Sequence, residues 1–203
     1  MPYKPNERVY RSMALVAPAE NENPYRVRGY ACTCDRYLLY EDIDGPVFEQ
    51  ISPHAFDNAD MSDVILQYDH AGRVYARTSN GTLHLSVDGH GLMIDGDLSL
   101  TDGSRELHSE IKTGLITRMS FCCTVAEGHF DQATSTSVID KIDKVFDVSA
   151  VSIPANPGTE IESRSAYDGE IIRARAERRD RIRRLKARIK ISEMAGGIQP
   201  WKN

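Results

Sequence analysis

The stretch from Ile116 to Val125 constrains the fold more than any other part of the chain. Its apolar side chains stand at every second position, as a half-buried β-strand requires: Met119, Phe121, Cys123 and Val125. The intervening side chains belong to the opposite face: Arg118, Ser120, Cys122 and Thr124. The pattern predicts a strand whose Ser120 side chain points away from the apolar core.

Similar alternation predicts a largely β domain around this strand. Residues 82–88 and 92–100 alternate on either side of Asp88-Gly89-His90-Gly91, which is typical of a β-hairpin. Further strands are expected from these apolar segments: 27–32, 47–51, 64–70, 138–144 and 145–153. The polar segment 128–137 is expected to be a loop.

Two helices are expected to flank the strands. Thr101 or Asp102 can cap a helix that runs to about residue 113, where Gly114 supplies a stop. Its apolar stripe is expected to be Leu107, Ile111 and Leu115. Ser52 followed by Pro53 is typical of the start of a shorter helix. The fold class is therefore mainly β with flanking helices (α+β).

Charge divides the chain into an acidic body and a basic tail. Residues 1–169 hold 14 Lys and Arg against 26 Asp and Glu, whereas residues 170–193 hold ten basic residues against four acidic ones. A helical pattern from Glu170 to Ile191 carries most of these arginines beside a stripe of isoleucine and leucine. Three roles stay open: a solvated helix that packs on the body or self-associates, a targeting segment that is later trimmed, and a nucleic-acid contact through residues 170–191.

Composition indicates a protein of the reducing cytosol. The apolar run from Met13 to Ala17 is too short for a membrane span or a signal peptide. The cysteines occur as Cys32-Thr33-Cys34 and Cys122-Cys123, which are neither zinc-ribbon nor thioredoxin spacings. We expect free, partly buried thiols and no cofactor or metal.

Serine chemistry needs a base and a group that orients the base. His70 ends an apolar strand just before Gly72, and Asp147 is a carboxylate within the apolar strand 145–151. Both are candidates to act with Ser120, although residues of these types more often serve as turn, surface or ion-pair residues. Cys122 is a rival nucleophile because it shares the face of Ser120. A metal site is the remaining alternative, with four candidate ligands: Asp69, His70, His84 and Asp88.

Several segments, in order, resemble the prohead (capsid maturation) proteases of tailed bacteriophages, the HK97-type group related in fold to herpesvirus assemblins. They lie between Val27 and Pro157, over 131 of 203 residues. The matching segments are Val27-Arg28-Gly29-Tyr30-Ala31, Ile51-Ser52-Pro53-His54-Ala55-Phe56, Tyr68-Asp69-His70-Ala71-Gly72-Arg73, Asp88-Gly89-His90-Gly91-Leu92, Ile111-Lys112-Thr113-Gly114, Met119-Ser120-Phe121 and Phe146-Asp147-Val148-Ser149-Ala150-Val151-Ser152-Ile153-Pro154-Ala155-Asn156-Pro157.

The resemblance implies roles for three residues. Ser120 corresponds to the nucleophile, His70 to the general base, and Asp147 to the orienting acid, where the family more often has Glu. Cys122 and Cys123 stand where the family commonly has glycine and an aromatic residue. Backbone N–H groups of residues 154–158, from Ala155 and Asn156, are the expected oxyanion donors.

The same resemblance implies a domain plan and a function. An irregular N-terminal arm that is a candidate propeptide (1–24) is expected to precede an assemblin-like, closed or partly closed β-barrel (25–158), and a linker with a basic helix (159–203) to follow it. The implied function is a serine endopeptidase, active inside the assembling prohead in the host cytoplasm. It would cleave itself and the scaffold or delta segments of the major capsid protein. A non-catalytic barrel that serves as an assembly module, with Ser120 and His70 facing water, is the alternative.

Overall fold

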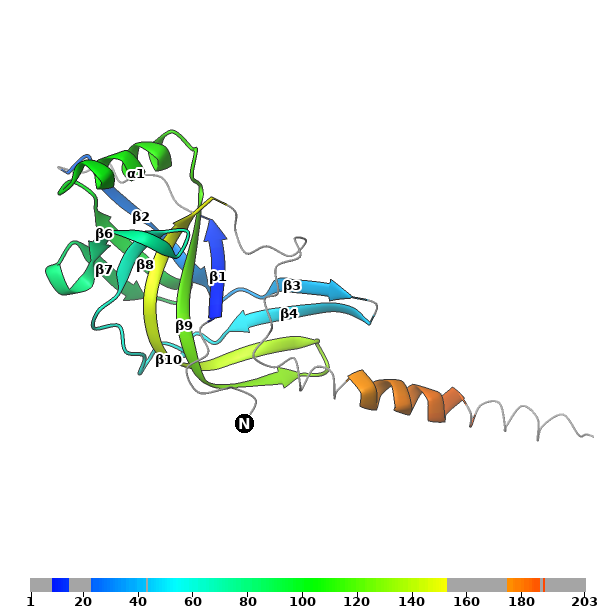
Figure 1. The fold of residues 1–203 in the computed structure, drawn as a ribbon. Helices are drawn as coiled ribbons and strands as arrows, with labels where there is room; N and C mark the ends of the chain where they lie inside the picture. Colours follow the sequence, from blue (N-terminus) through cyan, green and yellow to red (C-terminus); the bar gives the residue numbers. More distant parts are fainter. Residues whose placement is uncertain (1–8, 15–22, 43, 153–174, 187, 189–203) are drawn as a thin grey trace, which may run out of the picture.

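The computed structural model describes residues 9–14, 23–42, 44–152, 175–186 and 188. The described strands form two sheets, shown in Figure 1. The larger sheet has seven strands: β1 (Val9–Ala14), β3 (Tyr37–Asp42), β4 (Gly45–Ile51), β5 (Ile65–Tyr68), β6 (Ala71–Arg77), β9 (Arg118–Asp131) and β10 (Thr136–Val151). The smaller sheet has three strands: β2 (Arg26–Thr33), β7 (Leu83–Val87) and β8 (Gly91–Asp97). The mainly β, α+β fold class is thus confirmed, whereas the closed or partly closed barrel stays a prediction.

The long strand β10 organises the larger sheet. One of its edges pairs antiparallel with β9 along almost its whole length. Its other edge is divided between two parallel partners, β4 at residues 136–139 and β5 at residues 147–150. Strand β10 therefore has an N-terminal half beside β4 and a C-terminal half beside β5.

The core lies between the sheets and confirms the apolar face predicted for the Ser120 strand. Met119, Phe121 and Cys123 are fully buried, and the Phe121 ring lies 6.1 Å from that of Phe56, centroid to centroid. The opposite face is also covered, because Ser120 is 2% exposed and Cys122 is buried. The expected solvent-facing side of this strand is therefore wrong over its first half, where β9 is buried on both faces.

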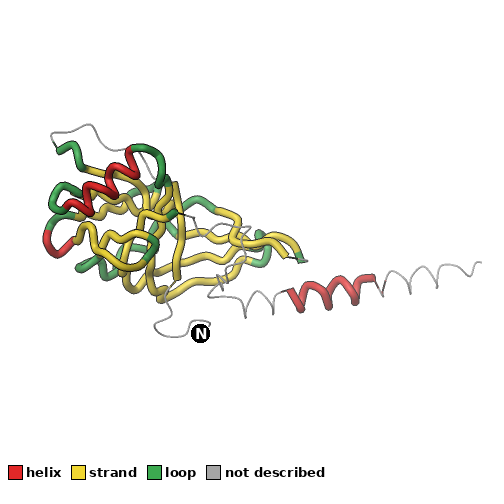
Figure 2. The backbone as a smooth tube through the Cα atoms, turned by 45° about the horizontal axis from the view of Figure 1, so that its top comes forward, coloured by secondary structure: helices red, strands yellow, loops and turns green. Residues whose placement is uncertain are grey.

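Helix α1 (Asp102–Lys112) and the basic helix lie at opposite ends of the described structure, as Figure 2 shows. Helix α1 begins as predicted, since the Thr101 side chain accepts a hydrogen bond from the Ser104 amide at 3.1 Å. Gly114, with a left-handed φ of 74°, follows its end. Leu115 is exposed rather than part of the buried stripe, because it lies beyond the last helical turn.

The basic helix is described at residues 175–186, which confirms helix there. Arg175 donates a hydrogen bond to the Gly45 carbonyl at 2.9 Å, and Arg179 forms an ion pair with Asp44 at 2.9 Å. These contacts attach the helix to the turn between β3 and β4. The targeting, self-association and nucleic-acid roles of this segment stay predictions.

Several local expectations are wrong. Residues 9–14, within the arm expected to be irregular, form β1, because the backbone of β9 offers them a free edge for pairing. Residues 52–59 form successive i→i+3 turns instead of a helix, with hydrogen bonds such as the one from the Ala55 amide to the Ser52 carbonyl. The loop expected at 128–137 is shorter, because β9 runs to Asp131 and β10 starts at Thr136.

The two strands expected at 138–144 and 145–153 are one strand, β10, whose register shifts absorb the break in alternation. The short helix η1 (Thr78–Asn80) connects β6 to β7. The hairpin of β7 and β8 is confirmed, although its connection spans residues 88–90 instead of 88–91, because Gly91 already belongs to β8. Among the described residues, no helix has both the length and the apolar character that a membrane crossing would need.

Candidate active site

A hydrogen bond between His70 and Asp147 forms the centre of the candidate site. His70 Nδ1 lies 2.6 Å from Asp147 Oδ1, although the two residues are 77 positions apart in the sequence. Both side chains are largely buried, at 16% and 7% exposed. An ionised carboxylate only accepts hydrogen bonds, so the imidazole donates through Nδ1. Nε2 is then the nitrogen that can take a proton from a nucleophile.

The turn between β5 and β6 presents His70. Tyr68 pairs with Ala71 across this two-residue turn, and the turn residues Asp69 and His70 have positive φ values of 48° and 56°. Positive φ is uncommon for residues other than glycine, although Asp and His adopt it more readily than most, and a two-residue hairpin turn of this kind needs it at both positions. Residues in such sparsely populated conformations persist where their surroundings hold them in place.

Contacts of Asp69 with the end of β10 hold this turn. Its amide donates to the Ala150 carbonyl at 3.0 Å. Its carboxylate accepts hydrogen bonds from the Ser152 amide at 2.9 Å and from the Ser152 hydroxyl at 2.8 Å. The turn that carries His70 is thus anchored to the same strand that carries Asp147.

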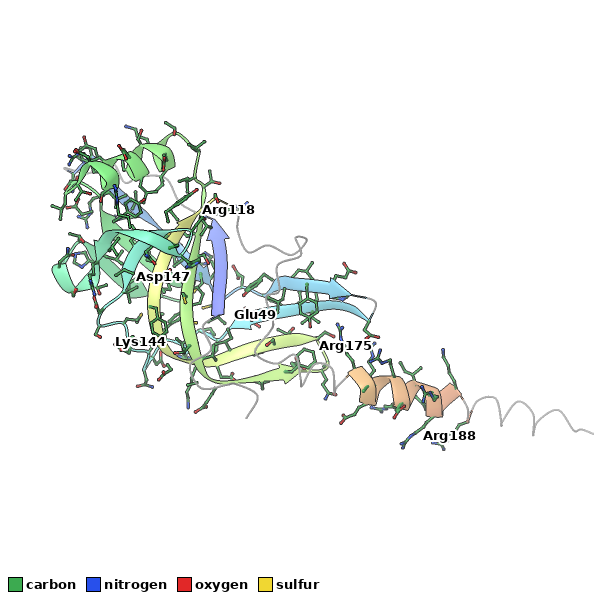
Figure 3. The ribbon with its side chains drawn as sticks, viewed as in Figure 1. Glu49, Arg118, Lys144, Asp147, Arg175 and Arg188 are labelled. Atoms are coloured by element: carbon green, nitrogen blue, oxygen red, sulfur yellow. The ribbon has the colours of Figure 1, made fainter. Side chains whose placement is uncertain are left out.

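Ser120 lies on β9, next to this part of β10. The backbone register places Ser120 directly opposite Ser149, and Cys122 opposite Asp147. Side chains that face each other across an antiparallel pair project from the same face of the sheet. Ser120, Ser149 and Asp147 therefore belong to one face. Figure 3 shows Asp147 within the body of strands, far from Arg175 and Arg188 on the basic helix.

The Ser120 hydroxyl is one of a few buried polar groups without a hydrogen-bond partner among the described residues. The side chain is 2% exposed, and its Oγ has no hydrogen-bond partner within the described ranges. A buried hydroxyl without a partner is costly, so each such group needs an explanation, and a catalytic role is one. The expectation of the assembly-module alternative, in which Ser120 faces water, is not met.

Ser149 is a residue of this site that the sequence reasoning missed. Its hydroxyl donates to Asp147 Oδ1 at 2.8 Å, on the same oxygen that His70 contacts. The signal was present in the sequence, since Asp147 and Ser149 are two positions apart in a strand and so share a face. Asp69 was also missed in its anchoring role, because its partner Ser152 is 83 positions away.

The metal alternative fits the geometry less well than the serine site, whereas Cys122 stays a rival nucleophile. All four cysteines are buried, and none of them forms a disulfide. Burial raises the pKa of Cys32 to about 12, so this thiol is not ionised near neutral pH. Of the four residues considered for a metal, Asp69 is bound to Ser152, Asp88 accepts from Tyr30 at 2.7 Å, and His84 is exposed. The described part of the chain contains no group of three His, Cys, Asp or Glu side chains able to hold a metal ion.

The residues expected to supply oxyanion donors, 154–158, lie outside the described residues. Chemically, the described part of the site has a nucleophile candidate on β9 beside a carboxylate–imidazole pair.

Comparison with protein families identifies the chain. The model of the caudovirus prohead serine proteases matches residues 13–170, which is most of the sequence. The chain belongs to this family. It is therefore a serine protease of the phage prohead type, and the resemblance noted in the sequence is confirmed.

A solved structure and the curated proteins add little to this identification. The capsid assembly protease of bacteriophage T4, gp21, aligns at 10% identity with a TM-score of 0.41, over 73% of this chain and 100% of that chain. A search of curated proteins gives no match.

Proposed function

We propose that this prohead protease cleaves peptide bonds with Ser120 as nucleophile, His70 as general base and Asp147 as the acid that orients the base. The hydrogen bond from His70 Nδ1 to Asp147 Oδ1 carries this proposal, because it fixes the imidazole tautomer that base catalysis needs. Family membership supports it by requiring a catalytic serine. Ser120 shares a sheet face with Asp147 and has a buried hydroxyl.

The reaction follows the general chemistry of serine proteases. Ser120 Oγ attacks the peptide carbonyl carbon while His70 Nε2 accepts the hydroxyl proton. His70 then delivers this proton to the departing amine, and water releases the acyl group from Ser120 in a second round. The negative charge of Asp147 stabilises the imidazolium ion that forms in each round. No step uses a metal or a cofactor.

The proposed substrates are proteins of the assembling prohead. A capsid maturation protease implies the major capsid protein as a substrate. We propose that the cleaved parts are its scaffold or delta segments and segments of the protease itself, within the prohead in the host cytoplasm. The N-terminal arm and the basic tail are the candidate sites of self-cleavage.

Replacing Ser120 by Ala tests the proposal. The wild-type chain and the Ser120→Ala variant are each produced with the major capsid protein of the same phage, and intact masses are measured over time. We expect wild type to yield defined fragments of itself and of the capsid protein. Ser120→Ala should reduce the rate by at least about 10⁴-fold, as for serine nucleophiles in general.

Cys122→Ala is the matched control, because Cys122 is the neighbouring buried residue on the same strand face. It should cleave at close to the wild-type rate. The assignment of Ser120 would be refuted if Ser120→Ala cleaved at the wild-type rate. It would also be refuted if only Cys122→Ala lost cleavage.

A further inference from the structure

A buried hydroxyl contacts the candidate catalytic acid from within its own strand. Ser149 is 0% exposed, and its Oγ lies 2.8 Å from Asp147 Oδ1. An ionised carboxylate has no proton to donate, so Ser149 is the donor. Hydrogen bonds to a charged group are stronger than those between neutral groups.

The Asp147 oxygen that Ser149 contacts is also the one that faces the base. Oδ1 accepts from His70 Nδ1 at 2.6 Å and from Ser149 Oγ at 2.8 Å. Two donors on one oxygen restrict the rotation of the carboxylate about its own side-chain bonds. They also disperse its negative charge in a site that is nearly closed to water.

The backbone position of Ser149 is determined on both sides. It pairs with Ser120 of β9 and with Gln67 of β5, so it lies between the strand of the nucleophile and the strand that leads to His70. The Asp147 backbone is held in the same way, opposite Cys122 and Ile65, so the hydrogen bonds to Oδ1 act on the rotation of the side chain. Ser149 thus ties the Asp147 carboxylate to a rigid part of the sheet.

We propose that Ser149 is a positioning residue for proteolysis, acting through Asp147. Its hydroxyl holds Oδ1 toward His70, so that the imidazole keeps the orientation and tautomer needed to accept the Ser120 proton. This inference rests on the proposed function. It adds Ser149, which acts through Asp147, to the three residues of the proposed function.

The test compares Ser149→Ala with Ser137→Ala. Both serines are buried on β10, but the Ser137 hydroxyl has no hydrogen-bond partner in the described part of the chain. Kinetics use a peptide that spans a self-cleavage site mapped on the wild-type protein. We expect Ser149→Ala to lower kcat about tenfold with KM changed by less than about twofold, and Ser137→Ala to leave both unchanged.

A spectroscopic readout separates positioning from general loss of structure. We expect the proton between His70 Nδ1 and Asp147 Oδ1 to give a far-downfield resonance in proton NMR, which is assigned by its loss in His70→Ala. Ser149→Ala should shift this resonance, whereas Ser137→Ala should leave it in place. If Ser149→Ala does not fold, Ser149→Cys preserves most of the volume and supplies a weaker donor, and it should show the same changes.

The outcomes distinguish the two proposals. Activity that survives in Ser120→Ala refutes the proposed function itself. If Ser120→Ala is inactive while Ser149→Ala keeps the wild-type kcat and an unmoved resonance, only the role of Ser149 is refuted. A lower kcat and a shifted resonance in Ser149→Ala, with neither change in Ser137→Ala, support the role of Ser149.

Discussion

The two halves of β10 are built alike, yet only one has the features of an active site. Each half runs parallel to a second strand and contains a buried serine: Ser137 beside β4 and Ser149 beside β5. Each also has a buried carboxylate close to that serine. Glu49 of β4 pairs in register with Ser137, and Asp147 lies two residues before Ser149.

The carboxylates differ in the partner that each one binds. Glu49 accepts a hydrogen bond from the Tyr37 hydroxyl, a pair within the β3–β4 hairpin. Asp147 accepts from the His70 imidazole, which arrives on a turn with two left-handed residues. An imidazole exchanges protons near neutral pH, and a phenol does not. A buried carboxylate alone therefore does not make a site; its partner does.

Replacing each carboxylate by its amide should separate the two halves most strongly. Asp147→Asn offers His70 an N–H donor, which favours the tautomer that cannot accept the Ser120 proton at Nε2. We expect kcat to fall by about 10⁴-fold, as for an amide in the same role in other serine proteases. Glu49→Gln should leave kcat unchanged. Equal losses of kcat in steady-state assays of the two variants would show that the partner of the carboxylate does not decide which half of β10 is active.

Substitutions at Asp69 should have an intermediate effect, because this residue anchors the turn of His70 to Ser152. Asp69→Ala removes the anchor and places a side chain that disfavours left-handed backbone at a φ of 48°. Asp69→Gly removes the anchor but tolerates that backbone. We expect both variants to lose activity, about tenfold or more.

Chemical denaturation should show Asp69→Ala to be less stable than Asp69→Gly by about 1 kcal/mol. Equal stability of the two variants would show that backbone strain at this turn is negligible. Full activity in both variants would show that catalysis does not depend on the anchoring of this turn by Asp69.

Tyr37→Phe should affect stability and leave catalysis unchanged. It deprives the buried Glu49 carboxylate of a donor, which should lower the free energy of unfolding by about 1–3 kcal/mol. Cleavage per folded molecule should equal that of wild type, as measured by urea titration beside the peptide assay. A drop in kcat would show that the two halves of β10 are coupled.

Sequence patterns predicted the elements whose periodicity is local. The buried face of β9, the hairpin of β7 and β8 and the capped start of α1 all follow from side chains within one segment. Strand β1 was missed because the edge that it occupies belongs to a strand more than a hundred residues away. The division of β10 between β4 and β5 likewise depends on partners that no local pattern reveals.

The candidate site was predictable to the extent that resemblance supplied it. Ser120, His70 and Asp147 were chosen because segments of the chain, taken in sequence order, resemble the prohead proteases. The contact between His70 and Asp147 appears only in the structure. The burial of Ser120 was not foreseen, because alternation assigns a face to a side chain without saying what covers that face. Ser149 and Asp69 were missed because their contacts are hydrogen bonds to other polar groups, and hydrophobic periodicity does not predict such contacts.

Active-site labelling tests the central claim, that Ser120 is activated by the His70–Asp147 pair, most directly. The wild-type chain is treated with a fluorophosphonate, a reagent that reacts with activated serines, and the modified peptide is mapped by mass spectrometry. We predict one adduct, on Ser120, that is absent in Ser120→Ala and strongly reduced in Asp147→Asn and His70→Ala. An adduct on another residue, or Ser120 labelling that is unchanged without His70, would contradict the account.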